Sequence, residues 1–211
     1  MVTLSALHSM LIEMHGGMLT LATVCIIAVI IAKSHQRLRR TSGWYNSFSR
    51  FDSLFDKLAQ YTDPAAYLAG IGGVVGLIAA SIVGFYVWPA EALVNSSLGL
   101  TKVMFTIFAT ELWIMFVAIR TRYKHGVWES RGLSAVYPLV GLSGFFFMVL
   151  TGSFGGHMAG KGSVLDPAYQ LLKLNPDALW LVGFDMIPVL IGVAFVEIVV
   201  VFAVFLRFRQ K

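Results

Sequence analysis

Charged residues are scarce in this chain. Asp, Glu, Lys and Arg make up only 13% of its 211 residues and apolar residues make up 57%, whereas about 25% charged is usual for a soluble domain. So few charges cannot cover a water-facing surface, which excludes an ordinary soluble fold. The sequence therefore predicts a protein that lies in a lipid bilayer.

Cysteine and recognisable catalytic motifs are also nearly absent. The single cysteine, Cys25, excludes a disulfide within the chain and leaves the redox compartment undefined. The sequence contains no nucleophile paired with a base, no phosphate-binding loop and no soluble domain. We therefore expect a non-catalytic subunit of a larger complex, although an enzymatic role stays open.

Long apolar segments are what the sequence does contain. A transmembrane helix needs about 20 mostly apolar residues. Five segments reach this length: 7–32, 65–88, 100–119, 133–153 and 178–206. The sequence thus predicts an all-α fold, a bundle of five transmembrane helices forming a single domain over residues 1–211. Small residues in the second segment, Gly70 and Gly73 among them, predict close helix packing.

The connection between the first two segments has its own pattern. Aromatic and aliphatic residues recur every three to four positions over 44–58, with charges between them. This spacing is typical of an amphipathic helix at the membrane surface. The dipeptide Asp63-Pro64 then predicts a break before the second transmembrane helix.

The basic residues indicate the orientation. Most of the 16 Lys and Arg residues fall within 33–64, 120–132 and 207–211, whereas Lys102, Lys161 and Lys173 do not. Basic residues in short loops are retained on the cytoplasmic side. The distribution predicts an exterior N-terminus and an interior C-terminus in the cell membrane. The net charge of +5 then reflects topology and not nucleic-acid binding.

Three histidines are predicted to lie on the exterior side. His8 and His15 are seven residues apart, so on a helix they face one way, with about 10 Å of rise between them. His157 follows glycines at the exterior end of the fourth segment. Histidines from two helices that meet in this way can bind a b-type haem. The alternative is that they are interfacial or packing residues, as we expect of the interior-side His35 and His125, which we interpret as surface groups.

Methionines lie close to these histidines in the sequence. Met14 and Met18 flank His15, and Met158 follows His157. Thioether and imidazole groups suit copper, above all Cu(I). A copper site that uses these methionines with the three histidines is a second interpretation. A cofactor-free scaffold packed against larger subunits is a third.

Acidic residues inside the apolar segments are a further anomaly. Glu111 in the third segment and Asp185 in the fifth each cost several kcal/mol in hydrocarbon unless they are partnered. They are either protonated, hydrogen-bonded packing residues or parts of a proton path or the wall of a quinone pocket.

Three stretches resemble a known family. They are "HSMLIEMH" (8–15), "FDSLFDKLAQYTDPAAYLAGIGG" (51–73) and "TGSFGGHM" (151–158). They are similar to the opening HPxxVHFP, the Asp-rich juxtamembrane stretch with its Gly-rich helix, and the closing TGxxGGxL of four-helix bacterial and archaeal membrane proteins. That family is a domain of unknown function suspected of haem binding, and the resemblance covers residues 6–163.

The resemblance implies haem ligation but also has departures. The prolines after both opening histidines are missing, and the third segment lacks a histidine that such families often carry, which implies fewer haems or none. Separately, "MHGGM" is similar to the stretch around a low-spin haem ligand in haem-copper oxidases, and this singles out His15.

The leading prediction is a membrane subunit of a redox or respiratory complex. It holds one b-type haem near the exterior face and passes electrons between a quinone and an exterior partner. His15 and His157 are the predicted ligands, and His8 is the alternative. Lipid and other membrane subunits are the expected partners.

Overall fold

The computed structural model describes residues 3–41, 51–89, 91, 93, 95–173, 188 and 192. Nearly all of these residues are helical, and no strand occurs among them. The predicted all-α fold is confirmed for this part of the chain.

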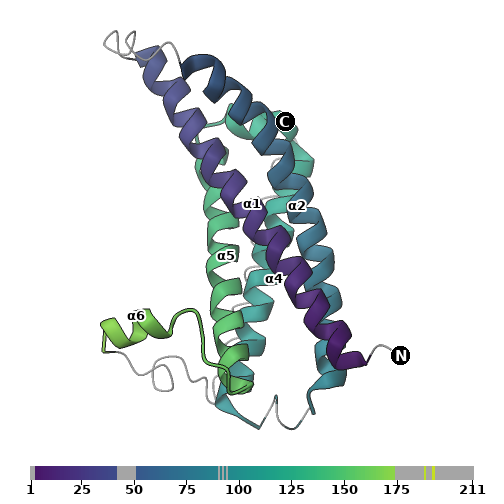
Figure 1. Cartoon of the computed structure of the whole chain (residues 1–211). Coiled ribbons are helices and arrows are strands. Elements are labelled where there is room, and N and C mark those ends of the chain that lie inside the picture. The colour runs from purple at the N-terminus through teal and green to yellow at the C-terminus, as the bar shows by residue number, and fades with distance from the viewer. Residues whose placement is uncertain are drawn as a thin grey trace. The chain divides into compact units, whose positions relative to one another are not determined.

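The described chain has four long helices and two short helical elements (Figure 1). They are α1 (Leu4–Thr41), α2 (Asp52–Val87), α4 (Ser97–Tyr123), the 3₁₀ helix η2 (Lys124–Trp128), α5 (Leu133–Met158) and α6 (Asp166–Leu171). Within the described ranges, four helices are long and apolar enough to cross a membrane: Leu4–Arg39, Asp52–Val87, Ser97–Trp128 and Leu133–Met158. They correspond to the first four predicted segments.

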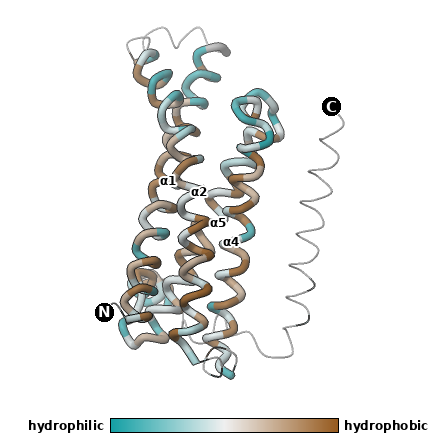
Figure 2. Tube along the Cα trace, turned by 90° about the vertical axis from the view of Figure 1, so that its right-hand side faces the viewer, coloured by the Kyte–Doolittle hydropathy of each residue, from teal (hydrophilic) through white to brown (hydrophobic). Residues whose placement is uncertain are grey.

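Other parts of the topology prediction are not tested. The fifth segment, 178–206, lies outside the described residues, apart from isolated helical positions at 188 and 192. The exterior position of the N-terminus also stays a prediction. Figure 2 shows hydrophilic residues gathered where α1 ends and α2 begins, at the end predicted to face the interior.

The second long apolar helix begins earlier than the sequence predicts. α2 runs from Asp52 through Pro64 to Val87, so the predicted break at Asp63-Pro64 is wrong. Proline removes one backbone donor and crowds the preceding turn, but side-chain contacts of Asp63 hold that turn in place. Residues 52–58 of the predicted surface helix belong to α2, and a separate amphipathic helix is unconfirmed.

The chain divides into two compact units. The first comprises Met1–Gly84 and Thr110–Phe145, and the second comprises Phe85–Ala109 and Phe146–Lys211. α2, α4 and α5 each contribute to both units.

Glycines of α2 allow α1 to approach closely in the first unit. A Cβ atom added at Gly73 would overlap the side chain of Leu19, and one added at Gly76 would lie 2.9 Å from the Cβ of His15. The earlier residue of α1, His15, meets the later glycine of α2, and Leu19 meets the earlier one, so the two helices are antiparallel. This confirms the close packing predicted from the small residues, which suits helices in lipid.

A larger side chain at Gly73 should separate these two helices. We expect Gly73→Val to destabilise the protein by about 1–3 kcal/mol, the usual cost of overpacking. Thermal unfolding in detergent would measure the loss. Gly17→Val is the control, because a Cβ at Gly17 meets nothing within 4 Å. Equal melting temperatures for the two variants would contradict the close contact.

Aromatic side chains form the centre of the first unit. The rings of Phe116 and Tyr137 stack with centroids 4.4 Å apart, and Trp113 meets Phe116 edge-on at 5.3 Å. All three are fully buried. Gly141 and Gly144 of α5 leave room for them, because a Cβ at either position would lie within 3.0 Å of a neighbouring side chain.

The second unit has a smaller apolar core. Phe105 of α4 packs with Leu150 and Phe154 of α5. The ring centroids of Phe105 and Phe154 are 5.6 Å apart, and Phe147 adds a further contact at 5.5 Å. These contacts join α4 and α5 near the ends that carry Lys102 and His157.

Candidate functional site

His15 has the arrangement of a potential metal ligand. It is 7% exposed, and its Nδ1 lies 2.7 Å from the carbonyl oxygen of Leu11. A carbonyl only accepts, so Nδ1 carries the proton and Nε2 keeps its lone pair. Metal-binding histidines commonly donate their other ring N–H in this way, which fixes the ring orientation. The residue therefore has the chemistry of one axial ligand.

His8 lies two turns earlier on the same face of α1. A Cβ added at Gly84 of α2 would lie 2.9 Å from His8 Cε1. The ring thus packs on an α2 glycine, as the Cβ of His15 does at Gly76. Both histidines therefore pack against glycines of α2.

Met14 and Met18 reach the same strip of α2. A Cβ added at Gly72 would lie 2.6 Å from Met18 Sδ, and one added at Gly76 would lie 3.3 Å from Met14 Cε. Both methionine side chains also keep exposed area, 42% for Met14 and 37% for Met18. The Met14 methyl group, the His15 Cβ and the Met18 thioether therefore meet α2 within about one turn.

His157 is held by a carboxylate in the second unit. Its Nε2 lies 2.9 Å from Asp166 Oδ1, which only accepts, so Nε2 carries the proton. The other carboxylate oxygen accepts the backbone N–H of Ser163 at 2.8 Å. A metal could then bind His157 only through Nδ1, unless the bond to Asp166 opens. Met158 is the last residue of α5.

The structure does not decide the predicted ligand pairs. The haem held by His15 and His157 and the copper site that adds Met158 both stay predictions. Among the histidine, cysteine and acidic residues that the structure describes, no three are grouped so that they could hold a metal ion. Glu111 is half-buried in α4, and Asp185 is outside the described ranges, so their predicted roles are untested.

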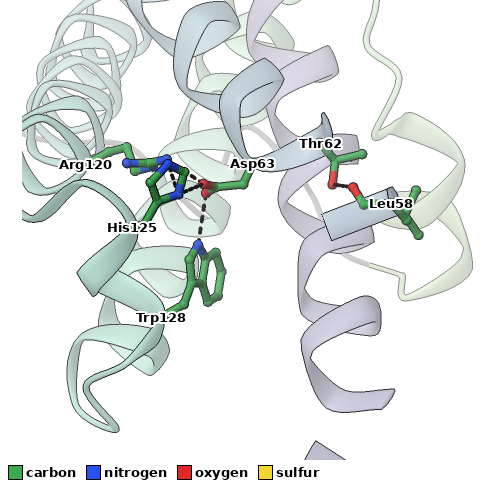
Figure 3. A network of polar contacts seen from close by, with 6 residues as sticks. All are labelled: Leu58, Thr62, Asp63, Arg120, His125 and Trp128. Atoms are coloured by element: carbon green, nitrogen blue, oxygen red, sulfur yellow. Dashed lines mark hydrogen bonds and ion pairs between the residues drawn. The ribbon is translucent and has the colours of Figure 1, made fainter. Parts of the chain in front are cut away.

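A buried ion pair in the first unit is the centre of a polar cluster that the sequence did not predict (Figure 3). Arg120 Nη2 of α4 lies 2.6 Å from Asp63 Oδ2 of α2, and the side chains are only 8% and 6% exposed. The indole Nε1 of Trp128 in η2 donates to Asp63 Oδ1 at 2.9 Å. One carboxylate thus joins three elements of the first unit.

Two further rings surround this pair. The ring of Tyr67 lies 5.8 Å from the guanidinium carbon of Arg120. His125 Nδ1 lies 3.9 Å from Asp63 Oδ2 and 3.4 Å from Arg120 Nη2. The side chain of His125 is 82% exposed, which confirms its predicted surface position. The cluster therefore extends from a buried carboxylate to solvent-accessible imidazole.

His35 contradicts its predicted surface position. It is buried, its Nε2 donates to Asp52 Oδ1 at 2.9 Å, and its ring stacks on Phe55 at 4.1 Å. Arg39 lies 3.2 Å from the other oxygen of Asp52. These contacts hold the start of α2 against the last turns of α1, and His35 is buried between the two helices.

Comparison of the chain with protein-family models, with curated proteins and with solved structures finds no match. The resemblance to the suspected haem-binding family therefore stays untested, and the function has to be argued from the site itself.

Proposed function

We propose that this chain is a subunit of a membrane redox complex and that His15 would hold a b-type haem. The supporting observation is the buried imidazole that donates Nδ1–H to the Leu11 carbonyl and keeps Nε2 for a metal. Four helices with the length and apolarity of membrane spans provide the setting. His157 is the proposed second ligand, and His8 is its alternative.

The chain's own residues would position the haem and set its reduction potential. The Leu11 carbonyl orients the His15 ring and raises its basicity, and Gly16 beside it removes side-chain bulk near the ligand. His157 has to bind through Nδ1 or release Asp166. When bound, a haem supplies one-electron transfer at a potential set by its ligands. In this proposal the electrons pass between a quinone and an exterior partner at the cell membrane.

The direct experiment is an absorption spectrum of the purified protein before and after dithionite, together with metal analysis. The proposal expects a sharpened α band on reduction and iron in proportion to haem. A featureless spectrum from protein expressed with sufficient haem would contradict it.

Copper is the second candidate. The observation in its favour is that Met14, His15 and Met18 meet α2 within about one turn, because soft thioethers with imidazole suit Cu(I). We expect Met14→Leu with Met18→Leu to lower bound copper several-fold, while haem content stays unchanged. Met10→Leu is the control, since this methionine is exposed on the same helix. Equal copper in all three proteins would remove the methionines from the site.

A cofactor-free structural subunit is the outcome if both experiments fail. The packing of His8 and His15 against glycines of α2 is compatible with that role. Iron and copper at background levels in protein purified from its native membrane would support it.

A further inference from the structure

Lys102 of α4 is a half-buried cation in the second unit. Its Nζ lies 5.6 Å from the centroid of the Trp88 ring. A Cβ added at Gly155 of α5 would lie 3.2 Å from the same Nζ, so the Lys102 side chain packs closely against this glycine. In the part of the chain that the structure describes, no ion pair involves Lys102.

A buried hydroxyl lies on the same face of α5. Thr151 precedes Gly155 by four residues, and positions four apart on a helix are neighbours on its surface. The Oγ1 of Thr151 is buried and has no hydrogen-bond partner within the described chain. The α5 face that Lys102 contacts at Gly155 thus carries a hydroxyl one helical turn away, and a cation with a nearby hydroxyl fits an anion with several oxygens.

The depth of Lys102 indicates the kind of anion. Lys102 is five residues from Ser97, the start of α4, which corresponds to about 8 Å of helix. Gly155 is similarly close to Met158, the end of α5. Tryptophan is enriched where membranes meet water, and Trp88 lies beside the ammonium. Lys102 and Trp88 therefore lie at the depth where lipid headgroups are expected.

We propose that Lys102, Thr151 and Trp88 bind the phosphate group of an anionic lipid at the ends of α4 and α5. The ammonium pairs with the phosphate charge and the Thr151 hydroxyl donates to a phosphate oxygen. Trp88 contacts the lipid at the interface, and Gly155 lets the Lys102 side chain lie close to α5. This proposal is independent of the haem proposal, since it uses none of the proposed ligands.

Native mass spectrometry of the full chain in detergent tests the proposal. The probe is phosphatidylglycerol, compared with phosphatidylcholine, which has no net charge. We expect Lys102→Gln to lower phosphatidylglycerol retention about fivefold, the factor that one basic residue near an anionic surface contributes. Lys161→Gln is the matched control, because Lys161 is exposed in the same unit. Equal retention in the wild type and in Lys102→Gln would overturn the proposal.

Two further measurements test the Thr151 hydroxyl and the choice of lipid over free phosphate. Thr151→Val preserves shape and should fold even if Lys102→Gln does not, and we expect it to reduce phosphatidylglycerol retention while leaving phosphatidylcholine retention unchanged. Unchanged phosphatidylglycerol retention in this variant would overturn the role of the hydroxyl. Inorganic phosphate at millimolar concentration should not displace the lipid. Displacement by inorganic phosphate would show a site for free phosphate and would overturn the lipid assignment.

Discussion

Replacing Arg120 by alanine is expected to destabilise the protein by about 3–5 kcal/mol, since removing one partner of a buried ion pair leaves the other charge uncompensated. Arg120 and Asp63 are nearly inaccessible to solvent, and the two polar atoms lie 2.6 Å apart. Trp128 would remain as a donor to the carboxylate, but a single neutral donor cannot replace the guanidinium charge. Unfolding in detergent, followed by denaturant titration, would measure the loss.

Two comparisons make this expectation specific to the buried pair. Arg122→Ala is the control, because Arg122 is exposed two residues further along α4. The double variant Asp63→Leu with Arg120→Met should be more stable than Arg120→Ala, since an apolar pair of similar volume removes both buried charges. If Arg120→Ala loses no more stability than Arg122→Ala, the ion pair does not join α2 to α4 as the distances indicate.

His15→Gln is expected to lower the haem content of the purified protein by at least about tenfold. Loss of a second-shell partner alone typically weakens a metal site 10–100-fold, and loss of the ligand itself should cost no less. Glutamine has a similar length and keeps a Cβ over Gly76, so the packing of α1 on α2 should survive. The haem-to-protein ratio, determined from absorbance after purification, is the measurement.

His125→Gln is the matched control for this variant. It makes the same chemical change at an exposed histidine outside the proposed ligand set. Its haem content should equal that of the wild type. Haem retained in His15→Gln would remove His15 from the site, and a melting temperature close to that of the wild type would show that the variant still folds.

The four long apolar helices were predictable because apolar length alone identifies them. Their ends were less predictable, since helical hydrogen bonds continue into polar sequence. α1 runs past Lys33 to Thr41, and α2 begins well before the apolar segment that starts at residue 65. The close contact of α1 with α2 was also predictable in kind, because Gly73 and its small neighbours leave space for an adjacent helix.

The Asp63 cluster was not predictable from the sequence, because it depends on which helices are neighbours. Asp63 next to Pro64 resembled a helix break, and Arg120 resembled one more interior basic residue. A usable signal did exist, since both lie at segment ends predicted to share one side of the membrane. His35 was misassigned for a related reason, because its burial depends on Phe55, which lies on the next helix.

The His157 bond to Asp166 shows a different limit. The two residues are only nine apart, but the turn that brings Asp166 back to the end of α5 includes Gly160 and Gly162, both with positive φ. Glycine adopts positive φ without steric cost, so these two residues allow the tight turn. The sequence spacing of His157 and Asp166 alone does not predict that the chain turns back at this point.

Electron paramagnetic resonance of the oxidised, purified protein tests the central claim most directly. The account predicts the signal of low-spin ferric haem, present in the wild type and lost in His15→Gln. A Cu(II) signal with its hyperfine lines would contradict it. The absence of any metal signal from protein expressed with sufficient haem and copper would also contradict it.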